Sequence, residues 1–141
     1  MSKKLILIST IVVSLFTVSC GNSQNKTPES AVANTEVIVN VDAKTFGELS
    51  RSQPGTVLDV RTPEEWAEGT LKDAVKINYQ GDNFESEIES LDKNAPVYVY
   101  CKRGGRSSSA AEILKEKGFT KIYNLDGGIT SWQENGFEVV K

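Results

Sequence analysis

The sequence of 141 residues contains no histidine, and this absence narrows the chemistry that is open to the chain. Imidazole is the usual general base at neutral pH, so hydrolases that activate serine or cysteine through histidine are excluded. Metal centres built on histidine ligands are also excluded, because the chain has no imidazole to bind the metal. We therefore expect no metal and no other cofactor, and any catalysis must use a group that is reactive without histidine.

The chain also lacks an excess of positive charge. Sixteen lysine and arginine residues stand against 19 aspartate and glutamate residues, which gives a formal net charge of −3. Loss of Lys3 and Lys4 with a signal segment would make the net charge −5. Because phosphate backbones are bound by basic faces, we expect no nucleic-acid partner.

No apolar run in the sequence is long enough to span a membrane. The longest extends from Leu5 to Val18 and contains four hydroxyl residues. Its 14 residues would reach roughly 21 Å as a helix, short of a hydrocarbon core of about 30 Å. Lys3 and Lys4 precede the run and small residues follow it, a pattern typical of a signal peptide.

The end of this run, Ser19-Cys20-Gly21, resembles the lipobox of bacterial lipoproteins. The resemblance implies cleavage after residues 1–19 and lipidation of Cys20. Thr17 departs from the leucine that is usual three positions before the cysteine, and a plain secretory signal or an uncleaved anchor is the alternative. We expect an exported protein of the cell envelope, on the periplasmic or cell-surface side, held to a bacterial membrane through its lipid anchor only.

Residues 20–35 contain few apolar side chains and are expected to form a flexible tether, because too little surface can be buried to offset the entropy of ordering them. Residues 36–141 remain as a single domain of common size.

Within residues 36–141, segments that favour strands alternate with segments that favour helices. Strands are predicted at 37–41, 56–60, 74–77, 96–100 and in a run that ends with Tyr123 and Leu125. Helices are predicted after Asp42, from Thr62, at 83–91, at 107–117 and around Ile129 and Trp132. This alternation favours an α/β fold with a mostly parallel, five-stranded sheet flanked by helices on both faces.

Local signals define two helix ends. Thr62 is expected at the N-cap, with Pro63 at the first helical position and Glu65 completing a capping box. Gly118 is expected to end the helix at 107–117. Trp66 is expected to lie in the core.

Cys101 follows the most β-prone run and precedes a glycine-bearing loop. Ligands of open α/β sheets bind beyond the carboxyl ends of the strands, which is where Cys101 is expected. Gly104 and Gly105 can adopt positive φ and turn backbone N–H groups inward, and a helix N-terminus follows. These features predict a lowered pKa for the Cys101 thiol and a site for a small dianion, assisted by three nearby cations: Lys102, Arg103 and Arg106.

The motif Cys101-x-x-Gly104-x-Arg106 resembles the active loop of the rhodanese family. Two further motifs resemble the upstream and downstream signatures of that family, namely Leu58-Asp59-Val60-Arg61-Thr62-Pro63-x-Glu65-Trp66 and Gly127-Gly128-Ile129-x-x-Trp132. The three motifs occur in the family's order, and the resemblance covers roughly residues 36–140. The chain has Gly69-Thr70-Leu71 where the family usually has Gly-His-Ile.

The resemblance implies a single-domain sulfurtransferase in which Cys101 is the catalytic nucleophile. Cys101 would take sulfane sulfur from a small sulfur-containing anion such as thiosulfate, carry it as a persulfide, and pass it to cyanide, a cellular thiol or an acceptor protein. The expected substrate-binding residues are Lys102, Arg103, Gly104, Gly105, Arg106 and Ser107. Asp59 and Arg61 are expected to support the loop as a buried pair, and Gly127, Gly128 and Trp132 to serve packing and turns.

Several alternatives remain open at the level of sequence. Some rhodanese-fold proteins are phosphatases or arsenate reductases, but the six residues from Cys101 to Arg106 match the sulfurtransferase loop, which is shorter by one. A non-catalytic sulfur relay would need the same persulfide site. Cys101 could also be a structural cysteine, or form a disulfide with Cys20.

Overall fold

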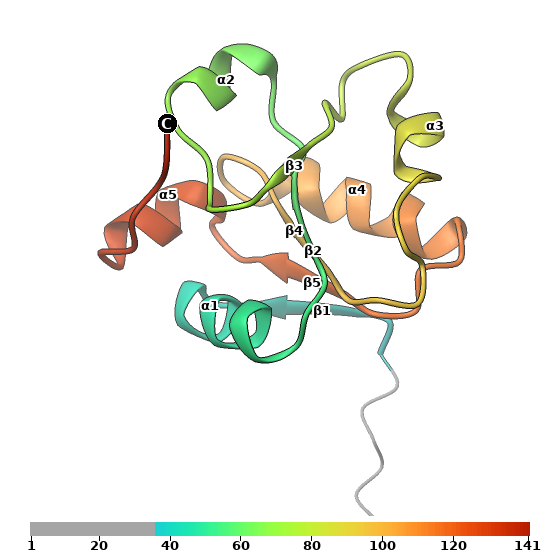
Figure 1. The fold of residues 1–141 in the computed structure, drawn as a ribbon, viewed down its shortest axis with the longest axis horizontal. Helices are drawn as coiled ribbons and strands as arrows, with labels where there is room; N and C mark the ends of the chain where they lie inside the picture. The colour runs from blue at the N-terminus through green and yellow to red at the C-terminus, as the bar shows by residue number, and fades with distance from the viewer. Residues whose placement is uncertain (1–35) are drawn as a thin grey trace, which may run out of the picture. The chain divides into compact units, whose positions relative to one another are not determined.

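The computed structural model describes residues 36–141, which lie within one compact unit, Asn34–Lys141 (Figure 1). The predicted signal peptide, the tether and the lipidation site at Cys20 lie outside the described residues. No helix within residues 36–141 has both the length and the apolar character that crossing a membrane requires.

Five parallel strands form the central sheet. In chain order they are β1 (Ile38–Val41), β2 (Thr56–Asp59), β3 (Val75–Lys76), β4 (Val97–Tyr100) and β5 (Ile122–Leu125). Their order across the sheet is β1-β5-β4-β2-β3, with every pairing parallel. All residues of β4 and β5 are buried, as expected for central strands covered on both faces.

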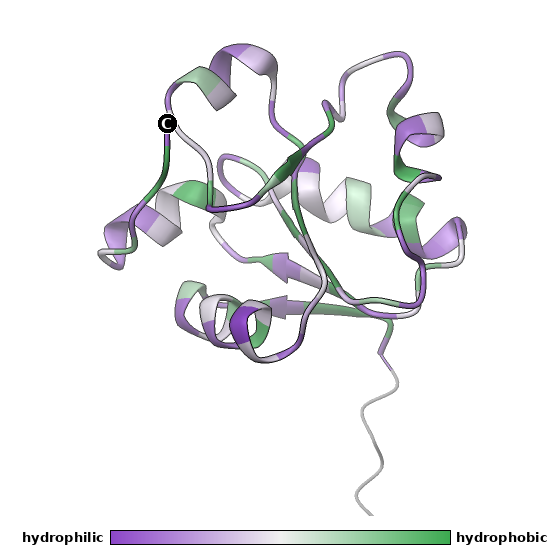
Figure 2. Ribbon diagram, viewed as in Figure 1, coloured by the Kyte–Doolittle hydropathy of each residue, from purple (hydrophilic) through white to green (hydrophobic). Residues whose placement is uncertain are grey.

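Helices cover both faces of the sheet, so the predicted α/β fold is confirmed. The helices are α1 (Ala43–Ser52), α2 (Pro63–Ala67), α3 (Phe84–Ile88), α4 (Gly105–Glu116) and α5 (Gly128–Glu134). Alternate residues of β4 point to opposite faces: Val97 and Val99 join one apolar cluster with residues of α3 and α4, and Tyr98 and Tyr100 join another with residues of α1 and α5. Figure 2 shows hydrophobic stretches along the central strands.

The predicted helix at 107–117 begins two residues earlier than expected, at Gly105. Gly104 has φ +99° and is the N-cap, so regular helical geometry starts directly after it. The far end is confirmed as predicted. Gly118 has φ +92°, and the amides of Gly118 and Phe119 donate to the carbonyls of Lys115 and Leu114 in the double bond pattern of a Schellman motif.

The predicted starts of two other helices are confirmed. Asp42 Oδ1 accepts from the Thr45 amide at 2.7 Å before α1, and Glu65 Oε2 accepts from the Thr62 amide at 3.1 Å before α2. The prediction that Trp66 lies in the core is wrong, because it is only half-buried and α2 has no buried residue. This helix of five residues lies beyond the end of the sheet instead of against one face (Figure 1).

Candidate active site around Cys101

Cys101 directly follows β4, at the carboxyl end of a central strand. Its residue surface is only 2% exposed, and its side chain belongs to the apolar cluster on the α4 face of the sheet. The loop from Cys101 to Gly104 then leads into α4. The prediction that Cys101 lies beyond the carboxyl end of a strand is therefore confirmed, and this is the edge where α/β sheets bind ligands.

Hydrogen-bond donors from the loop and from α4 surround the sulfur. The Gly104 amide donates to Cys101 Sγ at 3.1 Å, and the Ser107 hydroxyl lies 3.5 Å from the same atom. Of the two glycines expected to adopt positive φ, only Gly104 does so, and Gly105 is instead the first residue of α4. One left-handed residue is enough here, because the next amides are already turned inward by the first turn of the helix.

Burial raises the pKa of the Cys101 thiol, but hydrogen bonds overcome this effect. The Ser107 hydroxyl and the backbone amides of Ser107, Arg103 and Gly104 all stabilise the thiolate, and the resulting pKa lies below the ordinary value. The direction agrees with the expectation from the sequence, whereas the cause differs. Hydrogen-bond donors around the sulfur contribute more than the three neighbouring cations.

Arg106 is directed toward α2, where its guanidinium forms an ion pair with Glu65. Arg106 Nη1 donates to Glu65 Oε2 at 2.7 Å, and Nη2 donates to Oε1 at 2.8 Å. The hydrogen bonds from Arg106 lower the pKa of Glu65 to about 2. This bidentate pair connects the first turn of α4 with the start of α2. The Arg106 guanidinium is therefore bound to a protein carboxylate, whereas the sequence suggested that it would bind the substrate.

Sequence reasoning did not identify Glu65 as part of this site. Its place in a capping box already accounted for the residue, and Arg106 lies 41 positions further along the chain. The only signal in the sequence for this ion pair was an acidic residue in one motif and an arginine in another.

Lys102 and Arg103 are both exposed at the rim of an open hollow in front of Cys101. The hollow has a volume of about 470 Å³, and its lining consists of Cys101, Lys102, Arg103, Gly105 and Arg106. The expected substrate-binding residues therefore lie around Cys101. Four of them line the hollow, whereas Gly104 and the buried Ser107 do not line it and contact the sulfur instead.

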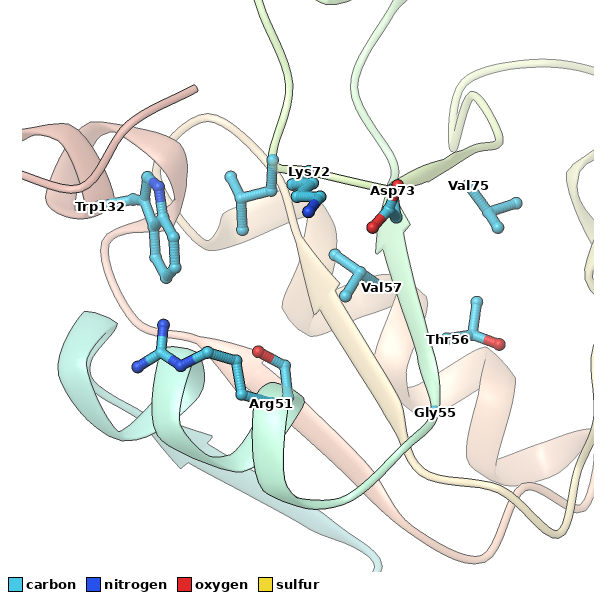
Figure 3. Close-up of a pocket in the computed structure, with 10 residues that line it drawn as sticks. Arg51, Gly55, Thr56, Val57, Lys72, Asp73, Val75 and Trp132 are labelled. Carbon is cyan, nitrogen blue, oxygen red and sulfur yellow. The ribbon is translucent and has the colours of Figure 1, made fainter. Parts of the chain in front are cut away.

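A second hollow, of about 510 Å³, lies away from Cys101 between the end of α1, the start of β2, the segment before β3 and α5 (Figure 3). Arg51, Lys72 and Trp132 are among its lining residues, and no residue of the Cys101 loop belongs to it. It contains no thiol, so we assign the reactive site to the smaller hollow.

The start of α5 packs directly against the active loop. The Ile129 amide donates to the Cys101 carbonyl at 2.9 Å, and Thr130 donates to the Lys102 carbonyl through its amide at 3.2 Å and its hydroxyl at 2.9 Å. A Cβ on Gly128 would lie 2.5 Å from the Cys101 carbonyl oxygen. Gly128 thus permits a close approach between two backbones, which is a more specific role than a general turn.

Asp59 and Arg61 form a buried pair at the carboxyl end of β2. Arg61 Nε donates to Asp59 Oδ1 at 2.9 Å and Arg61 Nη2 to Asp59 Oδ2 at 2.7 Å, while Nη2 also reaches the Gly69 carbonyl at 2.7 Å. The Tyr100 hydroxyl donates to Asp59 Oδ2 at 2.6 Å. Neither charged residue lines the hollow at Cys101, so their position fits a supporting role.

No group of histidine, cysteine, aspartate or glutamate residues that could hold a metal ion occurs among residues 36–141.

Within residues 36–141, the α/β domain has one cysteine, and hydrogen-bond donors of the loop and of α4 surround its sulfur, an environment that favours a reactive thiolate. The family model described as a rhodanese-like domain matches residues 42–135. This chain therefore belongs to the rhodanese-like domain family.

Similar proteins of known name support the same assignment. A sulfurtransferase from Allochromatium vinosum is 28% identical over 105 residues, which cover 74% of this chain and 96% of that protein. Thiosulfate sulfurtransferase GlpE from Pseudomonas fluorescens is 36% identical over 83 residues, which cover 59% of this chain and 74% of that protein. The crystal structure of a rhodanese-related protein from Thermoplasma volcanium superimposes with a TM-score of 0.64 at 30% identity, covering 72% of this chain and 97% of that one.

Proposed function

We propose that the protein is a sulfurtransferase that moves sulfane sulfur from a donor such as thiosulfate to a thiophilic acceptor, through a persulfide on Cys101. The observation that carries the proposal is the arrangement of hydrogen-bond donors around Cys101 Sγ, which favours an anionic sulfur in a buried place. Membership of the rhodanese-like family and the similarity to named sulfurtransferases are in agreement with it.

In the first step the Cys101 thiolate attacks the outer sulfur of thiosulfate. A new S–S bond forms on Cys101, the S–S bond of thiosulfate breaks, and sulfite leaves with the bonding electron pair. One thiolate and one dianion become one persulfide anion and one dianion, so no proton needs to be moved. A chain without histidine can therefore perform this covalent step.

In the second step the acceptor attacks the outer sulfur of the persulfide. With cyanide as acceptor, thiocyanate leaves and the Cys101 thiolate is regenerated, whereas a cellular thiolate would leave as a new persulfide. Between the two steps the negative charge lies on the outer sulfur of the persulfide, one bond beyond Cys101 Sγ, and the backbone amides of the loop would hold it there.

We assign the recognition of the donor anion mainly to Lys102 and Arg103. Both are exposed at the rim of the hollow, where neither forms an ion pair with another residue among 36–141. Arg106 contributes positive charge, but its fork is bound to Glu65, so we assign it to the positioning of the loop.

Intact mass measurement tests the proposal. After incubation with thiosulfate the protein should gain the mass of one sulfur atom, and subsequent cyanide should remove it and release thiocyanate. Cys101→Ser should show neither change while keeping the circular dichroism of the wild type. Thiocyanate production by that variant above a few per cent of wild type would contradict the mechanism.

A second candidate function is a sulfur relay, in which a partner protein and not thiosulfate supplies the sulfur. The open hollow with its exposed basic rim favours this alternative, since a protein-bound persulfide could reach Cys101 there. A protein that accepts sulfur stoichiometrically from a persulfidated partner, but turns over thiosulfate and cyanide no faster than Cys101→Ser, would be a relay.

A further inference from the structure

A chain of polar side chains connects the sheet to the active loop on the α4 side. It begins at Asn124, which is only 3% exposed within the central strand β5. Asn124 Nδ2 donates to Asn40 Oδ1 on the adjacent strand β1 at 2.8 Å and to the Ser108 hydroxyl in α4 at 3.0 Å. Both protons of the amide group are thereby used.

The contact from Asn124 determines where the Ser108 proton points. The Ser108 hydroxyl oxygen accepts from Asn124, and its own proton is donated to the Gly104 carbonyl at 2.8 Å. The Ser108 amide donates to the same carbonyl at 3.0 Å. Two donors match the two lone pairs of the Gly104 carbonyl oxygen.

The Ser107 hydroxyl has two possible acceptors but only one proton. Its oxygen lies 3.1 Å from the Gly104 carbonyl oxygen and 3.5 Å from Cys101 Sγ. If the Gly104 carbonyl lacked the Ser108 hydroxyl, the shorter contact would attract the Ser107 proton. With both lone pairs of that carbonyl satisfied by Ser108, the proton of Ser107 is available to the sulfur.

We propose that Asn124 and Ser108 are positioning residues, which direct the hydroxyl proton of Ser107 to the sulfur of Cys101. The inference rests on the proposed function in that the sulfur so stabilised is the one that carries the persulfide. Neither residue touches the sulfur or lines the hollow in front of it. Their effect is transmitted through the Gly104 carbonyl alone.

The burial of Asn124 supports this assignment. Its Oδ1 is buried without a hydrogen-bond partner among residues 36–141, which is an uncommon and costly state for a polar atom. Its partner in β4 is Val99, and apolar side chains surround this face of the sheet. An apolar residue would suit the position better for stability alone, so the amide has another use.

The test measures the alkylation rate of Cys101 as a function of pH in the full domain. Ser108→Ala should lower the rate about tenfold at pH values below the wild-type midpoint. The Ser107 proton would then turn to the Gly104 carbonyl, and the thiolate would lose its charge-assisted hydrogen bond from Ser107. Ser109→Ala is the matched control. Its hydroxyl makes the same kind of contact one residue further, with the Gly105 carbonyl at 3.4 Å, and the rate should not change.

Asn124→Leu provides a second, independent variant. It should shift the alkylation profile in the same direction as Ser108→Ala while keeping or raising the midpoint of thermal unfolding, because it removes an unpaired buried atom. A purely structural residue would change stability without moving the profile. The charged groups of the loop and of the elements around it are unchanged in these variants, namely Lys102, Arg103, Arg106, Glu65 of α2 and the buried pair of Asp59 and Arg61.

A double-mutant cycle with Ser107→Ala completes the test. If Ser108 acts through the Ser107 proton, Ser108→Ala should have no further effect on the alkylation profile once Ser107 is alanine. An unchanged profile in Ser108→Ala, or an undiminished effect in the Ser107→Ala background, would overturn the inference. Because alkylation requires no sulfur donor, this result is separate from the formation of persulfide, on which the proposed function depends.

Discussion

The sulfur of Cys101 is buried, yet the groups around it favour its ionised form. Burial alone would raise the pKa of the thiol, and the donors that lower it are a hydroxyl and three backbone amides. The cations of the loop lie further out, at the rim, or are paired with Glu65. At the scale of single residues, ionisation of the nucleophile and attraction of the substrate are therefore assigned to different groups.

This division predicts different effects for rim and cradle substitutions. Replacement of both Lys102 and Arg103 by alanine should raise the KM for thiosulfate about tenfold, and should remove most of its dependence on salt, because exposed charges act through a screened field. The alkylation midpoint of Cys101 should stay close to that of the wild type and below that of a free cysteine. A large upward shift of the midpoint in the double variant would mean that the cations, not the amides, ionise the thiol.

At the scale of elements, α2 and α4 are joined by the pair of Glu65 and Arg106. Both side chains are mostly buried, at 17% and 24% exposure, so solvent screens the pair less than it does an exposed one. The folded-state pKa of Glu65, about 2, lies below the ordinary value of 4.5. The pair therefore contributes stability above about pH 4.5, and this contribution is lost as the pH falls toward 2.

Glu65→Gln should lower the free energy of unfolding by about 1–2 kcal/mol at pH 7. Its stability should also decline less than that of the wild type between pH 5 and pH 3, since the group that titrates is gone. Urea unfolding at the three pH values measures both quantities. Parallel stability curves for the two proteins would show that Glu65 does not carry this part of the pH dependence. Arg106→Lys should keep the positive charge but lose the bidentate geometry. It should therefore retain only part of the stability that the pair of Glu65 and Arg106 contributes.

Helix α5 is the second element that positions the loop, and Gly128 is the point of closest contact. Gly128→Ala would combine a strained φ of +61° with a Cβ only 2.5 Å from the Cys101 carbonyl oxygen. We expect a loss of several kcal/mol of stability, or an active loop displaced enough to reduce sulfur transfer by more than tenfold.

Gly136→Ala is the matched control for this effect. Gly136 has φ +79°, but a Cβ there would meet no atom within 4 Å. It should cost only the strain of the backbone, about 1–2 kcal/mol, with normal activity at temperatures where the protein is folded. Equal losses of stability and activity in the two variants would argue against a specific contact at Gly128. Thermal unfolding and thiocyanate production are the measurements.

At the scale of the whole molecule, we propose that the domain is exported and anchored by a lipid on Cys20. The support is the pattern of Lys3, Lys4, the short apolar run and Ser19-Cys20-Gly21, all of which lie outside the residues that the structure describes. The rhodanese-like domain would then act at a membrane surface, on sulfur compounds of the cell envelope.

Cys20→Ala should abolish labelling by a fatty-acid probe and release the protein from the membrane fraction, since stable anchoring depends on the acyl chains. Cys101→Ala serves as the control and should leave labelling and membrane association unchanged. Wild-type protein recovered entirely in the soluble exported fraction would instead indicate an ordinary secretory signal.

Features that depend on neighbouring residues were determined by the sequence itself. The alternation of strands and helices, the N-caps at Asp42 and Thr62 and the end of α4 at Gly118 all arise within a few positions. The place of Cys101 at the end of a central strand followed from the same local pattern, because hydrophobic periodicity and turn residues act over short distances.

The contacts that shape the site were decided only by the tertiary structure. Glu65 meets Arg106 across 41 positions, Gly128 meets the Cys101 carbonyl, and Asn124 meets Ser108, while Trp66 remains half-buried because α2 lies on neither face of the sheet. Each of these depends on the strand order β1-β5-β4-β2-β3, which brings the ends of distant strands and helices together. Sequence periodicity indicates which face of an element is buried, but the partner on that face is chosen by the packing of the whole sheet.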